Sequence, residues 1–149
     1  MSWDKEVEDL RRREELAEKM GGDEKLARQH NAGKLDARER LRRLVDAGSF
    51  REIGKIAGKA NYDSDLNLAD FAPSNFIFGR AKIDGRHLVA SADDFTVRGG
   101  AADAALHRKF VQCEKMAHTM GLPLIRMIDG TGGGGSVKTL EDMGYTYIP

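Results

Sequence analysis

Residues 75–92 decide the fold class of this chain, and they read Asn-Phe-Ile-Phe-Gly-Arg-Ala-Lys-Ile-Asp-Gly-Arg-His-Leu-Val-Ala-Ser-Ala. The first half is rich in aromatic and β-branched residues, which is the composition of a β-strand. Asp84-Gly85 follows, and this dipeptide is the strongest short-range signal for a tight hairpin turn. The run from His87 to Ala92 then returns as a second strand. The stretch therefore predicts an antiparallel β-hairpin.

The residues after the hairpin predict a strand–helix–strand unit. A long helix is expected over Ala101–Met120, and Gly121 ends it. The predicted buried stripe of this helix recurs at alternating spacings of four and three residues and comprises Leu106, Phe110, Cys113, Ala117 and Met120. Leu122–Asp129 is then a compact, mostly apolar run, which is typical of a buried parallel strand. Strand, helix and strand together indicate an α/β fold.

The residues before the hairpin predict a helical segment. Helices are expected over Trp3–Met20, from Asp23 to about Gly33, and from Asp36 to about Gly48. Trp3, Val7, Leu10 and Ala17 form one apolar stripe on the first of them. Glu39 follows Asp36 by three residues, which is the spacing of a capping box. Residues 53–75 carry many Gly, Asn, Asp and Pro residues and are expected to form loops around one short strand at the start of the segment. We therefore predict a helical amino-terminal segment over residues 1–52 and an α/β domain over residues 53–149.

Composition limits the class of protein. The chain has 149 residues, of which 40% are hydrophobic and 32% charged, so it holds enough apolar residues for a core. Lys+Arg and Asp+Glu each number 24, and this balance argues against a dedicated nucleic-acid binder. A single cysteine fits a reducing compartment. No apolar run has the length of a membrane span, and the acidic start has no signal-peptide pattern, so the expected location is the cytoplasm.

A glycine run directly follows the last predicted strand and precedes a short predicted helix, Val137–Met143. It reads Gly130-Thr131-Gly132-Gly133-Gly134-Gly135-Ser136. A glycine loop between a strand and a helix exposes backbone N–H groups that bind phosphate, carboxylate or an oxyanion. A phosphate-binding Walker loop is excluded, because Val137 stands where that motif requires glycine. The run also matches the glycine pattern of dinucleotide-binding proteins, but a run of glycines matches many patterns by chance. A backbone oxyanion hole is therefore the favoured interpretation.

Side chains offer no comparable signal for catalysis. The pair Asp93-Asp94 suits a metal or acid–base chemistry, but nothing nearby completes a ligand set, and no metal site is expected. The four histidines lack metal-ligand spacing with one another or with Cys113, which is expected in the core. No nucleophile motif of the Gly-x-Ser-x-Gly kind is present. These absences favour electrostatic stabilisation by the backbone.

Several segments, in the same order, resemble the carboxyltransferase (beta) subunits of biotin-dependent acyl-CoA carboxylases, of the propionyl-CoA and methylcrotonyl-CoA carboxylase type. The matching segments are Gly33–Leu41 with Asp46–Phe50, the hairpin Gly79–Arg86, the turn Asp94–Gly100, and Leu122–Ile125 with the glycine run. The resemblance covers residues 33–149. It implies a partial crotonase-like (ββα) domain behind the helical segment.

The resemblance also implies an activity and a set of site residues. The activity is transfer of a carboxyl group from carboxybiotin, carried on a separate domain or subunit, to the α-carbon of an acyl-CoA. When the roles in the family's glycine loop are carried over by position, the backbone N–H groups of Gly132, Gly133 and Gly134 form the oxyanion hole. Acyl-CoA binding is assigned to Lys34, Arg38, Gly99 and Gly100. The implied partners are the biotin carboxyl carrier, the biotin carboxylase subunit, and further copies of the chain.

Length separates this chain from the family pattern, because family members continue with further ββα units and a homologous second half. We therefore expect the chain to be inactive without a complementary half. Two other functions stay open: a non-catalytic acyl-CoA-binding or assembly module, and, with weaker support, a piece of a dinucleotide-binding oxidoreductase. The sequence leaves the acyl group undetermined.

Overall fold

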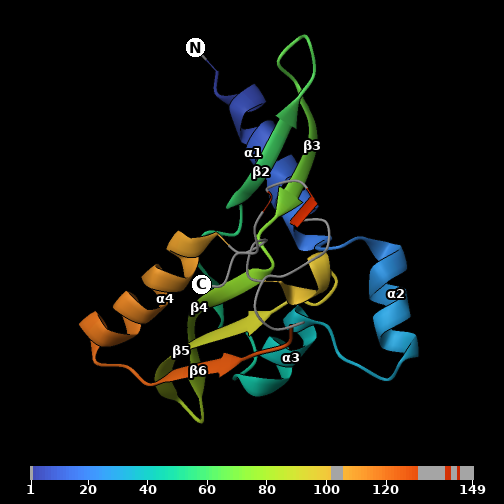
Figure 1. Ribbon diagram of the computed structural model, residues 1–149. Coiled ribbons are helices and arrows are strands. Elements are labelled where there is room, and N and C mark those ends of the chain that lie inside the picture. The colour runs from blue at the N-terminus through green and yellow to red at the C-terminus, as the bar shows by residue number, and fades with distance from the viewer. Residues whose placement is uncertain (1, 102–105, 131–139, 142–143, 145–149) are drawn as a thin grey trace.

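The computed structural model describes residues 2–101, 106–130, 140–141 and 144 (Figure 1). Three helices come first: α1 (Asp4–Glu18), α2 (Asp23–Asn31) and α3 (Ala37–Leu44). The Asp36 side chain accepts a hydrogen bond from the Glu39 backbone N–H at 2.9 Å and so caps α3, as the sequence predicts. The helices lead into a mixed sheet, which gives the expected α/β architecture.

The main sheet has the strand order β1-β4-β5-β6, with β1 (Arg51–Glu52), β4 (Phe76–Ile83), β5 (Arg86–Asp93) and β6 (Leu124–Met127). Strands β4 and β5 form the predicted antiparallel hairpin about Asp84-Gly85, where both residues have a positive φ. Strand β6 lies parallel to β5, and α4 (His107–Met120) connects the two. This is the predicted strand–helix–strand unit, but β6 is not the predicted buried strand. It lies at the edge of the described sheet, and none of its residues is fully buried.

Helices α3 and α4 cover opposite faces of the sheet (Figure 1). On one face, Leu41 of α3 packs against Ile77 and Leu88. On the other, Cys113 and Ala117 of α4 pack against the strand residues Phe76, Phe78 and Val89. Successive strand residues point to opposite faces, so one hairpin supplies both cores. The predicted place of Cys113 in the core is confirmed, since its exposed fraction is 1%.

Residues 53–75 differ from the prediction, because they hold a second hairpin rather than loops around one short strand. Strands β2 (Gly58–Tyr62) and β3 (Leu68–Pro73) pair with each other, and α1 packs against β3. Only Leu68, Phe71 and Pro73 of this hairpin are buried. A strand pair with so few buried residues leaves little alternation in the sequence, and its Gly, Asn and Asp residues indicate turns instead.

The two helical stripes also depart from the prediction. Helix α4 begins at His107 rather than Ala101, because Leu106 has an extended backbone (φ −71°, ψ 111°). Leu106 and Met120, the ends of the predicted stripe, are 41% and 47% exposed. On α1, Ala17 is buried, whereas Trp3, Val7 and Leu10 of its predicted stripe are exposed. No helix within the described residues combines the length and apolar character needed to span a membrane.

Candidate functional site

The carboxyl ends of β5 and β6 lie at the same edge of the sheet, because the strands are parallel neighbours. In α/β proteins, ligands bind beyond this edge, where the loops that leave the strands meet. The turn after β5 runs through Asp94 to the short 3₁₀ segment η1 (Arg98–Gly100). The turn after β6 begins at Asp129 and Gly130. These two turns are the segments in which the sequence places Gly99, Gly100 and the glycine run.

The structure brings the two turns into direct backbone contact. A Cβ placed on Gly100 would lie 2.8 Å from the Cα of Gly130, and a Cβ on Gly130 would lie 2.8 Å from the Gly100 carbonyl oxygen. Atoms of real side chains do not approach so closely, so glycine is required on both sides of the contact. The glycine run therefore starts against the Gly99-Gly100 turn.

The Gly99-Gly100 turn has an unusual backbone. Arg98, Gly99 and Gly100 have φ values of 52°, 63° and 67°, so three consecutive residues lie in the left-handed region. Glycine adopts this region freely, but Arg98 carries a cost of about 1–2 kcal/mol. Backbone strain of this kind concentrates at ligand-binding and catalytic sites.

Arg40 of α3 ties the two strand ends together. Its guanidinium donates a hydrogen bond to the Asp93 carbonyl oxygen at 2.5 Å. The same nitrogen lies 3.5 Å from the carboxylate of Asp129. One side chain thus contacts the last residue of β5 and the turn after β6, which fixes the separation of the two turns.

The two aspartates of the Asp93-Asp94 pair have different environments. Asp94 is fully buried and accepts hydrogen bonds from the Thr96 backbone N–H at 2.8 Å, the Thr96 hydroxyl, and the Ala37 backbone N–H at 3.4 Å. It joins the turn to the start of α3, which is a structural role. Burial raises the pKa of Asp93, although Arg126 and Arg40 oppose the shift. Among the described residues, neither aspartate belongs to a group of three potential metal ligands.

Lys34, a predicted acyl-CoA contact, lines a pocket of about 140 Å³ on the helical side of the Asp94–Gly100 turn. Its Nζ lies 5.5 Å from the ring centroid of Phe95. The wall contains three cations and no acidic residue, and it is made by Lys25, Arg28, Gln29, Ala32, Lys34, Phe95 and Thr96. The pocket is smaller than the usual range of about 300–1,000 Å³ for whole organic ligands. Its size and charge suit a single anionic group such as a phosphate.

Two of these cations, Lys25 and Arg28, are not among the acyl-CoA-binding residues that the sequence predicts. They lie three residues apart on α2, and neighbours at this spacing share one face of a helix. That signal is present in the sequence, but only the fold shows that this face meets Lys34 and Phe95.

Arg38, the other predicted basic contact, is engaged elsewhere. Its guanidinium makes two hydrogen bonds to the Glu52 carboxylate of β1, at 2.8 Å and 3.4 Å. For Arg38 to bind a CoA phosphate, its hydrogen bonds to Glu52 must first break. The predicted oxyanion-hole residues Gly132, Gly133 and Gly134 lie outside the described residues.

An α/β fold with helices ahead of the sheet and glycine turns at the ends of two parallel strands agrees with the crotonase-like partial domain that the resemblance implies. Comparison with known sequences identifies the family, because the profile of the carboxyl transferase domain matches residues 28–147. The chain belongs to the carboxyl transferase domain family.

Individual relatives agree with this family. The chain is 32% identical over 132 residues to the propionyl-CoA carboxylase carboxyltransferase subunit of Haloferax mediterranei, covering 89% of this chain and 26% of the relative. It is 33% identical over 126 residues to the methylmalonyl-CoA carboxyltransferase 12S subunit of Propionibacterium freudenreichii subsp. shermanii, covering 85% and 24%. The chain thus spans about a quarter of the length of these relatives.

Solved structures give the same fold. A transcarboxylase 12S crystal structure, described as a hexamer with methylmalonyl-coenzyme A and methylmalonic acid bound, matches with a TM-score of 0.74 and 32% identity. The match covers 89% of this chain and 26% of that one. The crotonase-like fold predicted from the sequence is confirmed for this part of the domain.

Proposed function

We propose that this chain supplies an acyl-CoA-binding part of a biotin-dependent carboxyltransferase. The observation that carries the proposal is the backbone contact between Gly100 and Gly130 at the carboxyl ends of β5 and β6. It sets two glycine turns beside each other in a chain of the carboxyl transferase family. Backbone N–H groups at such a place stabilise the negative charge that develops on a thioester oxygen.

The residues have separate roles in this proposal. Lys34, with Lys25 and Arg28, binds a phosphate group of CoA in the small basic pocket. The turn at Gly99-Gly100 and the run through Gly132, Gly133 and Gly134 bind the thioester. Carboxybiotin, delivered by a separate carrier, supplies the carboxyl group. The α-carbon would give its proton to the biotin nitrogen that releases the carboxyl group, and the resulting enolate, which the oxyanion hole would stabilise, would take up that carboxyl group.

The proposed substrates and partners follow the relatives. These relatives are named for propionyl-CoA and methylmalonyl-CoA, so these are the first acyl-CoA esters to test. Methylcrotonyl-CoA, which the sequence resemblance suggests, comes next. The proposed partners are a biotin carboxyl carrier, a biotin carboxylase subunit, the remaining part of a carboxyltransferase, and further copies of this chain. The proposed location is the cytoplasm, on the evidence of the single cysteine.

A hybrid enzyme tests the proposal. The chain replaces the matched quarter of the Propionibacterium 12S subunit, and carboxyl transfer from methylmalonyl-CoA is assayed. We expect measurable transfer, and its loss in the same hybrid with Gly100→Ala. A folded hybrid that binds methylmalonyl-CoA without transfer supports the non-catalytic binding module instead. A folded hybrid that does neither contradicts the proposal.

A further inference from the structure

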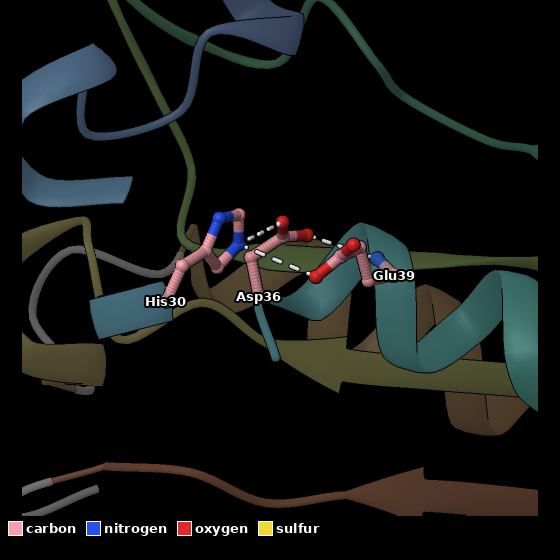
Figure 2. A group of neighbouring side chains, drawn as sticks. All are labelled: His30, Asp36 and Glu39. Atoms are coloured by element: carbon pink, nitrogen blue, oxygen red, sulfur yellow. Dashed lines mark hydrogen bonds and ion pairs between the residues drawn. The ribbon is translucent and has the colours of Figure 1, made fainter. Parts of the chain in front are cut away.

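Figure 2 shows a group of potential metal ligands, none of which belongs to the glycine turns. It contains His30 from the last turn of α2, Asp36 at the start of α3, and Glu39 from the first turn of α3. The His30 Nε2 lies 3.0 Å from an oxygen of Asp36 and 3.3 Å from an oxygen of Glu39. The three ligand atoms all lie within 4.8 Å of one another. Two carboxylates thus face one imidazole nitrogen.

We propose that His30, Asp36 and Glu39 bind a divalent transition metal ion of the Zn²⁺ class. Zinc–nitrogen and zinc–oxygen bonds are about 2.0–2.2 Å long, so neighbouring ligand atoms in a tetrahedral site lie roughly 3.3–3.5 Å apart. The two distances from His30 Nε2 are close to this spacing. All three ligand atoms lie within 4.8 Å of one another, so side-chain rotation can bring them to this spacing, and the Glu39 side chain is 29% exposed.

The local charges favour a cation at this point. Two carboxylates outweigh the partial positive charge of the α3 amino terminus, and His30 lies near the partially negative carboxyl terminus of α2. Asp36 is prepared as a ligand, because its Oδ1 accepts the Glu39 backbone N–H while its Oδ2 faces His30. Such a supporting hydrogen bond orients a ligating carboxylate.

Burial leaves the site open on one side. The Asp36 side chain is 11% exposed, whereas the His30 side chain is 44% exposed. Water can therefore complete the coordination, and the ion has a path from solvent. One imidazole nitrogen with two carboxylate oxygens suits Zn²⁺, Co²⁺ or Mn²⁺, whereas Mg²⁺ and Ca²⁺ prefer oxygen ligands alone.

A metal here links α2 to α3. Helix α2 also carries Lys25 and Arg28 of the basic pocket, so the ion would hold that wall in place. Metal binding can nevertheless be tested separately from acyl-CoA binding, because none of the three ligands lines the pocket.

Binding of the metal alone provides the test. The untagged chain is titrated with Zn²⁺ by calorimetry, and Co²⁺ is followed by its visible absorption, which reports coordination geometry. Three variants remove one ligand each: His30→Ala, Asp36→Asn and Glu39→Gln. Asparagine still caps a helix, so Asp36→Asn separates metal binding from the capping role. His118→Ala, at an exposed position on α4, is the matched control.

We expect one bound Zn²⁺ per chain, and unchanged binding in His118→Ala. Loss of an outer partner of a metal ligand costs about 10–100-fold in affinity, so each ligand variant should lose at least that much. Zn²⁺ should also raise the melting temperature of the parent chain but not that of Asp36→Asn. The proposal is overturned if no saturable binding occurs, or if a folded His30→Ala or Asp36→Asn chain binds Zn²⁺ like the parent.

Discussion

The backbone of Gly100 lies against the carbonyl group of Asp129, so that a Cβ on Gly100 would be 2.1 Å from the Asp129 oxygen. This contact joins the turn after β5 to the point where the chain leaves β6. Arg40 reinforces it, because the Arg40 guanidinium contacts Asp93 and Asp129 together. The relative position of the two glycine turns is therefore set by backbone packing and one partly buried side chain.

Gly100→Ala should destabilise the fold more than a glycine substitution that meets no neighbour. Gly85 is the matched control, because it also has a positive φ (75°) and no atom lies near its Cβ position. Gly85→Ala should cost about 1–2 kcal/mol of unfolding free energy from strain alone. Gly100→Ala adds a collision and should cost roughly 1–3 kcal/mol more. Urea unfolding measures both, and equal losses would show that the two turns are not in contact.

The α4 core predicts a graded response to truncation. Phe76 is 1% exposed, and its ring centroid lies 4.1 Å from that of the half-buried Phe110. Phe76→Ala should lower the free energy of unfolding by about 3–5 kcal/mol, the usual cost of a fully buried phenylalanine. Phe110→Ala should cost less, roughly 1–3 kcal/mol, because solvent already reaches its ring. A reversed order, measured by chemical denaturation, contradicts this packing.

Lys109 predicts a pH-dependent stability. Burial lowers its pKa from 10.5 to about 8, although Glu52 opposes the shift. Below pH 8 the lysine is charged in both states, and folding carries the full cost of burying the charge. Between about pH 8 and 10.5 the unfolded chain binds more protons, so stability from this group rises with pH.

Lys109→Met should therefore raise the free energy of unfolding at pH 7, by about 1–3 kcal/mol. The gain should shrink as the pH approaches about 10, where the parent lysine is largely neutral when folded. Denaturant titrations of both proteins across this pH range provide the measurement. A gain that is constant with pH would show that it comes from improved packing rather than from the charge.

The hairpin about Asp84-Gly85 and the cap at Asp36 follow from the sequence because both are local. Turn chemistry and capping involve residues within three or four positions of one another. Helix α4 also follows from the sequence, because its apolar residues recur at helical spacing, and strand β6 follows from a short, mostly apolar run. The β2–β3 hairpin was missed because few of its residues are buried, which removes the alternation that indicates a strand.

The sites depend on contacts that no local pattern contains. Lys34 was selected from the resemblance, but its neighbour Phe95 lies far away in sequence. His30 has no metal-ligand spacing with another histidine or with Cys113, and its partners in the fold are carboxylates beyond the end of its helix. The pairing of Arg38 with Glu52 likewise joins α3 to β1 and becomes visible only in the fold.

The exposed edge of the sheet predicts self-association near neutral pH. Strand β1 and the chain on either side of it cover the outer edge of β4 from Phe78 to Lys82, but within the described residues no strand pairs with the outer edge of β6. Ile128, just after β6, is 74% exposed. Open strand edges with apolar neighbours recruit further chains, and a net charge of zero gives little repulsion.

Light scattering over a concentration series at pH 7 measures this association. Ile128→Lys should shift the chain toward the monomer, because charge at an edge opposes pairing. Leu66→Lys is the control, since Leu66 is 82% exposed on the β2–β3 loop and should leave association unchanged. A monomer at every concentration contradicts the prediction.

Equilibrium binding of propionyl-CoA tests the central claim most directly. The account predicts saturable binding that weakens in Lys34→Gln and Arg28→Gln, by about tenfold or more for each lost charge-assisted hydrogen bond. Arg12→Gln on the exposed face of α1 should bind like the parent. Propionyl-pantetheine, which lacks the nucleotide phosphates, should be insensitive to the Lys34 and Arg28 changes. The account is contradicted if the folded chain binds no propionyl-CoA, or if both pocket variants bind it as tightly as the parent.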